Sequence, residues 1–311
     1  MSNINIMKQD IIPFSSEKFC HAPALMVLPN ENLLCVWYAG SFECASNQAI
    51  YMANGERVKD GWIWGRPRKI VDTKGHADGN PVFFFANNEI HLFFVTLQGK
   101  AWDTAILRTV KSKDGIKWEG IKELSREQGV MCRNKPLALF NGEWLLPLYD
   151  EKEWTPLFWL SGDKGKTWRE ISRVKSPRRI IQPAIIEIDG VILALCRSGE
   201  GRIFEMQSFD GGKNWTEPTP TLFLNPNSAI DLAVADGHLF LAFNNSAKKR
   251  SPLCLAKSVS NGSWKIFFLE NANDGEFCYP SLVATSKEVH CVYTVWQGGR
   301  MAIRYAWLPT I

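Results

Sequence analysis

Short apolar segments recur along the chain, and each follows a brief polar turn. The turns lie at 30–32, 87–89, 141–142, 189–190, 236–237 and 286–288, and the apolar segments at 33–38, 90–95, 144–149, 191–196, 238–243 and 289–296. The segments are rich in β-branched, aromatic and Leu residues, and Asn-Gly or Asp-Gly between such segments is a strong hairpin signal. Helical periodicity is absent. The pattern predicts an all-β protein built from six copies of one hairpin unit.

A second repeat has the form Ser-x-Asp, then Gly, then Trp. It occurs at 112–118, 161–168 and 208–215, with weaker copies at 59–62 and 258–264, and successive tryptophans of the strong copies are 50 and 47 residues apart. In such a turn Asp bonds nearby backbone amides, Gly accepts positive φ, and Trp packs the turn onto the sheet. A period near 50 residues indicates a propeller or another repeat architecture. Because each repeat can hold four short strands, we predict a six-bladed β-propeller with Asp-box turns, forming a single domain over residues 1–311.

The composition narrows the function. Apolar residues make up 45% and charged residues 22%, which is typical of a soluble globular protein. No apolar run approaches the roughly 20 residues that span a bilayer, and residues 1–14 lack a signal-like stretch, so we expect a cytoplasmic protein with no membrane partner. The net charge of +4, without a Lys/Arg stripe, favours anionic ligands mildly and argues against nucleic acid. Eight scattered cysteines in apolar surroundings predict buried thiols, with no metal and no cofactor.

The hairpin geometry predicts where polar side chains gather. The first strand of each hairpin begins, and the second ends, at the same rim. The first strands begin with a polar residue at or near Pro, and equivalent positions in a rotational repeat form a ring. The residues predicted on this ring are His21, Asn80, Lys135, Gln182 and Tyr279, and the fifth repeat departs from the pattern with Asn227 upstream and Asp231 inside. The second strands end near Glu43, Glu151 and Arg197. The Asp boxes lie at the opposite end, so we expect them to be structural.

In such a fold the functional site is expected at a rim that gathers polar side chains around the channel mouth. The predicted substrate-binding residues are Arg197, Arg250, Arg133, Lys135, Gln182, Asn80, Asp78, Asn227 and Asp231. Purely structural roles for these residues stay open. Strand-end arginines are often solvated or paired, Asn and Gln before Pro can satisfy backbone groups, and Asp78 can simply shape its turn.

The chain resembles the sialidase (neuraminidase) superfamily over nearly its whole length. Tyr279-Pro280-Ser281-Leu282 is similar to the segment that carries the family's nucleophilic Tyr, Arg250 in 249–253 is similar to an Arg that precedes it, and Arg197 is similar to an Arg that follows a Gln-Pro and Asp-Gly hairpin. The resemblance implies a carboxylate held by three arginines, a Tyr nucleophile assisted by a Glu, and an Asp as acid/base.

Three family features are missing. The Arg of Arg-Ile-Pro is replaced in His21-Ala22-Pro23, Ile180 and Ile181 stand where the assisting Glu is expected, and the loop 40–47 has Glu43 as its one carboxyl. A tyrosine has an ordinary pKa near 10 and needs a partner base to become a nucleophile. Glu276 and Glu151 are the candidates for that base.

The sequence therefore predicts a sialidase-like exo-glycosidase that acts on a different acidic sugar, such as a uronic acid or a different ulosonic acid. Tyr279 or a carboxylate is the candidate nucleophile, and Glu43, Glu151 or His21 the candidate acid/base. Two alternatives remain. A His21/Tyr279 pair could abstract the proton alpha to a uronate carboxylate in a lyase reaction, or the propeller could bind carbohydrate or act as a scaffold without catalysis.

Overall fold

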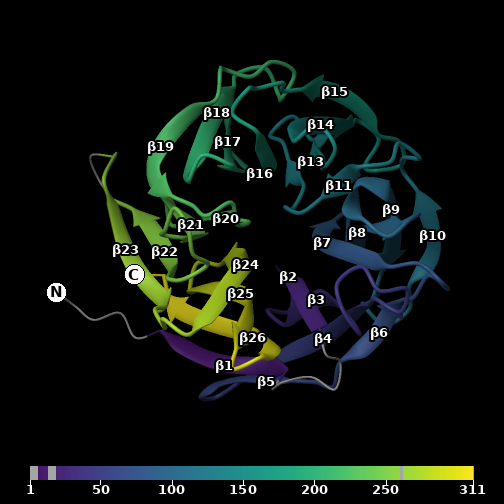
Figure 1. Ribbon diagram of the computed structural model, residues 1–311, viewed down its shortest axis with the longest axis vertical. Coiled ribbons are helices and arrows are strands. Elements are labelled where there is room, and N and C mark those ends of the chain that lie inside the picture. The colour runs from purple at the N-terminus through teal and green to yellow at the C-terminus, as the bar shows by residue number, and fades with distance from the viewer. Residues whose placement is uncertain (1–5, 13–18, 260–261, 311) are drawn as a thin grey trace.

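The computed structural model describes residues 6–12, 19–259 and 262–310, and it is an all-β ring of six sheets around a central axis (Figure 1). Blade 1 holds β2 (Phe19–Val27), β3 (Leu33–Gly40), β4 (Ala49–Val58), β5 (Gly61–Trp64) and β6 (Arg68–Val71); blade 2 holds β7 (Asp78–Ala86), β8 (Glu89–Leu97), β9 (Ala105–Ser112) and β10 (Glu119–Glu123); blade 3 holds β11 (Val130–Cys132), β12 (Leu137–Ala138), β13 (Trp144–Asp150), β14 (Thr155–Ser161) and β15 (Arg169–Arg173). Blade 4 holds β16 (Ile180–Ile188), β17 (Val191–Ser198), β18 (Arg202–Ser208) and β19 (Thr219–Leu224); blade 5 holds β20 (Asp231–Ala235), β21 (His238–Asn244), β22 (Leu253–Ser258) and β23 (Trp264–Glu270); blade 6 holds β24 (Gly275–Ala284), β25 (Glu288–Gln297), β26 (Arg300–Pro309) and β1 (Met7–Ile12).

The predicted six-bladed propeller is confirmed. Each apolar segment expected from the turn rhythm forms the second strand of a blade, namely β3, β8, β13, β17, β21 and β25. The one helical element among the described residues is a 3-10 turn at Trp102–Thr104. Within the same residues, no helix is long and apolar enough to cross a membrane.

The core lies between the blades. Six clusters of buried apolar side chains occur, and each draws residues from two neighbouring blades. The cluster between blades 6 and 1, for example, packs Trp37 of β3 against Tyr305 and Trp307 of β26. A blade has two apolar faces, so each face is buried only when a neighbour covers it. The eight cysteines are all free thiols, seven of them buried, as predicted.

The ring is closed by pairing the first strand with the last. β1 is the outermost strand of blade 6 and runs antiparallel to β26 (Figure 1). Arg304 of β26 donates to Asp10 of β1 at 2.6 Å and to Glu270 of β23 at 2.9 Å. Tyr293 also donates to Glu270, at 2.8 Å. This half-buried network therefore joins blades 5 and 6 to the N-terminal strand.

The Asp boxes are turns between the third and fourth strands, at the rim opposite the proposed site. In the box of blade 3, Asp163 accepts hydrogen bonds from Thr167 and from the amides of Lys166 and Thr167, and these bonds lower its pKa to about 2. The tryptophans of the boxes in blades 3 and 4 pack onto the preceding blade: Trp168 contacts Phe93, and Trp215 stacks on Phe158 with ring centroids 4.2 Å apart. These boxes therefore link neighbouring blades, beyond the expected packing of a turn on its own sheet. The weak copy at 258–264 contains residues 260 and 261, which lie outside the described residues.

The inner strands share a backbone irregularity at the site rim. Register with the second strand shifts by one residue in blades 1, 2, 4 and 6, which is a β-bulge. The residue before Pro takes a left-handed conformation in each, with φ of 48° at Ala22, 46° at Asn80, 56° at Gln182 and 55° at Tyr279. His21 therefore occupies the position one residue earlier than its predicted equivalents, and its counterpart in blade 6 is Cys278.

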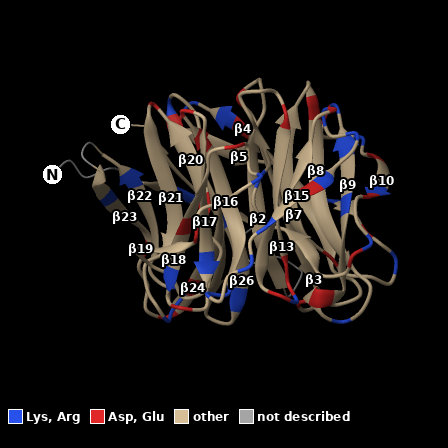
Figure 2. Cartoon of the chain, turned by 90° about the horizontal axis from the view of Figure 1, so that it is seen from above, with Lys and Arg blue, Asp and Glu red and all other residues tan. Residues whose placement is uncertain are grey.

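Charged residues avoid the blade interiors. Seen from the side, Lys, Arg, Asp and Glu gather mainly on the loops at the two ends and on outer strands (Figure 2). The exceptions inside the channel matter for function and are described below.

The closing network generates a stability prediction. The substitution Arg304→Met should lower the free energy of unfolding by about 1–2 kcal/mol, because Asp10 and Glu270 lose their half-buried partner. Chemical denaturation measures the change. The matched control is Lys287→Met, since the Lys287–Glu31 pair is 71% exposed on both sides and should contribute less than about 0.5 kcal/mol. Equal effects of the two substitutions would contradict the assigned role of Arg304.

Candidate functional site

Tyr279 is the centre of the candidate site. It comes from β24, and its hydroxyl accepts a hydrogen bond from Arg197 of β17 at 2.9 Å. The guanidinium carbons of Arg133, Arg250 and Arg197 lie 5.3, 5.5 and 5.9 Å from the centre of its ring. The prediction that residues far apart in the chain converge on one mouth of the channel is therefore confirmed for Tyr279, Arg197 and Arg250.

His21 packs against Tyr279 with its ring tilted. Its ring centroid lies 4.3 Å from that of Tyr279, and its Nδ1 is 3.0 Å from the Thr294 hydroxyl. Burial lowers the pKa of His21 well below its ordinary value, and the positive charges of Arg250, Arg133 and Arg197 lower it further. The imidazole is thus neutral at neutral pH.

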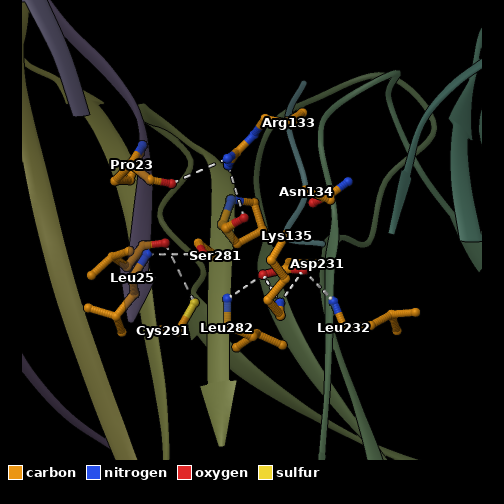
Figure 3. Close-up of polar contacts among 12 residues, drawn as sticks. Pro23, Leu25, Arg133, Asn134, Lys135, Asp231, Leu232, Ser281, Leu282 and Cys291 are labelled. Atoms are coloured by element: carbon orange, nitrogen blue, oxygen red, sulfur yellow. Dashed lines mark hydrogen bonds and ion pairs between the residues drawn. The ribbon is translucent and has the colours of Figure 1, made fainter. Parts of the chain in front are cut away.

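Arg133 holds the backbone around Tyr279. It lies between β11 and β12 of blade 3 and is 2% exposed, yet its terminal nitrogens cross the channel to the carbonyls of Tyr279 (2.9 Å), Pro280 (3.1 Å) and Pro23 (3.4 Å). Figure 3 shows the contact with Pro23. A left-handed conformation costs a non-glycine residue roughly 1–3 kcal/mol. The contacts with two carbonyls that flank the bulge stabilise this strained segment. Direct contact between Arg133 and a substrate stays a prediction.

Three carboxylates surround the centre at different depths. Glu43, on the exposed loop between β3 and β4, accepts hydrogen bonds from Tyr38 (3.4 Å) and Trp102 (3.3 Å). Glu276 of β24 lies 3.7 Å from Arg250. Glu151 follows β13, and burial raises its pKa while Arg197 lowers it. A carboxyl with a raised pKa is suited to proton transfer, as a general acid or as a general base.

A cleft of about 390 Å³, whose lining includes Cys278 but not Tyr279 itself, opens on the His21 side of this centre. It is lined by His21, Glu43, Arg250, Glu276, Thr294 and Trp296, together with neighbouring residues of blades 1 and 6. The cleft thus places one cation, one neutral imidazole and two carboxylates around a space that fits a sugar-sized ligand.

Asn80 and Gln182 lie at the mouth as predicted, but both donate to the hydroxyl of Tyr149, each at 3.0 Å. Tyr149 is buried at the end of β13 and was not predicted. It ends an apolar strand and could have been recognised, because inward-facing positions at the ends of second strands were already expected to reach this rim. Tyr38 contacts Glu43, and Thr294 contacts His21. Neither was predicted, although both also lie near the ends of second strands.

Lys135 and Asp231 lie deeper than expected. Lys135 binds both carboxylate oxygens of Asp231 at 2.7 Å, and Asp231 also accepts from the amides of Leu282 and Leu232 (Figure 3). Lys135 lines a separate, largely apolar cavity at the opposite end of the channel. The structure thus corrects the expected position of Lys135, because the guanidinium of Arg133 takes the place at the mouth.

Asp78 is fully buried and accepts hydrogen bonds from Thr96 and from the amide and hydroxyl of Thr73. These contacts match the alternative in which Asp78 shapes its turn. Asn227 has a φ of 59° and follows Pro226, which lines a neighbouring cleft described below. Among the described residues, no group of three or more His, Cys, Asp or Glu side chains is placed to hold a metal ion.

Comparison with known proteins agrees with this geometry. The six-bladed ring and its Asp-box turns are those of the BNR-repeat propellers of the sialidase superfamily. Residues 31–291 match the family described as BNR repeat-like domain, and the chain belongs to that family. No curated protein has a matching sequence.

Solved structures share the fold at low sequence identity. A protein of unknown function from Dyadobacter fermentans is 16% identical with a TM-score of 0.81, covering 98% of this chain and 99% of that one. The sialidase of Trypanosoma rangeli in complex with the inhibitor DANA is 12% identical with a TM-score of 0.80, covering 98% of this chain and 60% of that one. The NanB sialidase of Streptococcus pneumoniae is 12% identical with a TM-score of 0.80, covering 96% of this chain and 70% of that one. At these identities the likeness shows the fold alone.

The contacts of Arg133 yield a prediction. Arg133→Met should lower the free energy of unfolding by about 2–4 kcal/mol, because buried carbonyls lose their donor next to a strained bulge. Amide hydrogen exchange should speed up most in β24 and the start of β2. Arg133→Lys keeps the charge but cannot reach three carbonyls at once, so it should recover only part of the loss. Full recovery by Lys would show that charge alone matters.

The neutral His21 yields a pH prediction. Its unfolded-state pKa is near 6.5 and its folded-state pKa is lower, so between these values the unfolded chain binds the proton and the folded chain does not. Stability from this residue is complete above about pH 6.5 and is lost as the pH falls towards the folded-state value. In His21→Gln, the fall in unfolding free energy from pH 7 to pH 5 should be shallower, by up to about 1.4 kcal/mol per pH unit. His290 also has a lowered pKa, of about 4, so His290→Gln should flatten the curve similarly. An unchanged curve in His21→Gln would contradict a neutral His21.

Proposed function

We propose that this protein is a glycoside hydrolase that acts on an acidic sugar, with Tyr279 as nucleophile. The observation that carries the proposal is the Arg197–Tyr279 hydrogen bond of 2.9 Å within a group of three guanidiniums beside a cleft. Guanidinium pairs with carboxylate in a bidentate fork, so Arg250 at the cleft and Arg197 behind it suit the carboxylate of a sugar acid.

The roles follow from position. Tyr279 attacks the anomeric carbon through its oxygen, and the glycosidic bond breaks as Glu43 gives a proton to the leaving oxygen. Glu276, which lines the same cleft, or Glu151 accepts the phenol proton. Water deprotonated by Glu43 then displaces Tyr279 and releases the sugar, and the Tyr279 oxygen takes its proton back from Glu276 or Glu151. Arg197 stabilises negative charge on the Tyr279 oxygen in both steps, because it already donates to that atom.

The lost family arginine explains why we propose an acidic sugar other than sialic acid. His21 takes that place, and it is neutral, so it offers a hydrogen bond where a charge is expected. Arg133 adds a third positive charge near Tyr279, but its terminal nitrogens already bind carbonyls. The clamp therefore has fewer free donors for a carboxylate than three arginines would supply, and for this reason we propose a different acid, such as a uronate.

One observation favours a second candidate, a uronate lyase. The neutral imidazole of His21 lies 4.3 Å from the Tyr279 ring, and such a pair can take the proton alpha to the carboxylate and protonate the leaving oxygen. The products separate the two reactions, since elimination creates a carbon–carbon double bond that absorbs in the ultraviolet and hydrolysis does not.

The test is Tyr279→Phe on a panel of aryl glycosides and oligosaccharides of acidic sugars. Turnover should fall on the order of 10²–10⁴-fold while binding of the free sugar changes less than about tenfold, because the hydroxyl is lost and the arginines remain. Release of the aryl alcohol and calorimetry measure the two quantities. Tyr51→Phe on β4 is the matched control and should change neither. Unaltered turnover in Tyr279→Phe would refute the proposal, and binding without turnover by the natural chain would favour a non-catalytic carbohydrate-binding protein.

A further inference from the structure

A second cleft, of about 550 Å³, adjoins the one that holds His21. Three connections between strands line it, at 248–251, 273–276 and 297–299, and all belong to blades 5 and 6. Arg250, Glu276 and Trp296 line both clefts. The two spaces therefore form one continuous depression that runs from blade 1 across blade 6 to blade 5.

Trp296 is the shared wall of this depression. It lies near the end of β25, opposite Glu276 in the strand register, and is 51% exposed. Within the described part of the chain, no aromatic ring or cation stacks on its indole. A large aromatic face left open on a cleft wall offers a platform for a flat, largely apolar ligand surface such as the face of a sugar ring.

The residues that line the second cleft have a positive net charge. Lys248 and Lys249 are exposed on its lip, and among residues 6–12, 19–259 and 262–310 no carboxylate lies within ion-pair distance of either. The cleft also holds two acids: Glu276 lies 3.7 Å from Arg250, and Asp274 accepts from the neutral amide of Gln297 at 3.0 Å and so keeps its negative charge. Lys248, Lys249 and Arg250 against Asp274 and Glu276 leave the lining with one positive charge in excess. Two lysines without partners beside a platform favour an anionic ligand.

We propose that the second cleft binds the sugar attached to the acidic sugar, and that this second sugar carries an anionic group, a sulfate or a carboxylate. The inference rests on the proposed function and narrows its substrate class to anionic oligosaccharides of two or more units. Trp296 stacks on the second ring, Lys248 and Lys249 bind its anionic group, and Arg250 lies between the two sugars.

Calorimetry with three probes tests the inference. The probes are glucuronic acid, a disaccharide with glucuronic acid at its non-reducing end, and the same disaccharide with sulfate on its second sugar. The natural chain should bind the plain disaccharide about tenfold more tightly than glucuronic acid, and the sulfated one more tightly again. Trp296→Ala should remove the advantage of both disaccharides, whereas Trp296→Phe should keep most of it. Lys248→Ser/Lys249→Ser should remove only the advantage of sulfate and its salt dependence.

Matched controls lie elsewhere on the surface. Phe268→Ala removes a 55% exposed aromatic from β23, and Lys166→Ser/Lys213→Ser removes two exposed charges from the Asp-box rim, so neither should change any affinity. If glucuronic acid binds and both disaccharides bind no better, the second cleft is not a sugar site and the proposed function stands. If no probe binds the natural chain, the proposed function fails and this inference fails with it.

Discussion

The packing of one blade against the next is the constraint on which the molecule depends. Every blade has two apolar faces, and each of the six buried clusters is shared by two blades. No blade can therefore bury its faces alone, and the ring must close through β1 and β26. Closure is also what makes the site, because Arg197, Arg250, His21 and Tyr279 come from blades 4, 5, 1 and 6.

The site keeps a positive field while changing its donors. Three guanidiniums surround the Tyr279 ring, but one of them, Arg133, comes from blade 3 and is committed to carbonyls of the channel wall. Where the resemblance expects an arginine of blade 1, a neutral histidine packs against the tyrosine. Positive potential attracts any anion, whereas free, directed donors decide which anion fits. Histidine in place of the expected arginine therefore keeps the attraction of the site for an acid but changes which acid fits best.

Much of the fold was predictable because its signals are local. Hairpin turns and Asp boxes depend on a few adjacent residues, and the turns placed the second strand of each of the six blades. The meeting of His21 and Tyr279 was also predictable, since the first and last blades of a closed ring are neighbours, and the structure confirms it.

The remaining parts of the site depend on side-chain reach and on bulges. Lys135 was expected at the mouth, but its amine turns down the channel to Asp231, and Arg133, two residues earlier, reaches the mouth in its place. Pattern alone cannot tell which of two long cations turns each way. The shared contact of Asn80 and Gln182 with Tyr149 likewise depends on side chains from three blades meeting at one hydroxyl.

The left-handed residue before Pro limits what evolution can place at the mouth. Ala22, Asn80, Gln182 and Tyr279 have four different side chains at this one position, so the rim accepts great chemical variety. None of them is branched at Cβ, and Val, Ile or Thr would meet a steric penalty there that is independent of any ligand. The left-handed conformation of this one backbone position thus limits which side chains the rim can carry, independently of any selection for activity.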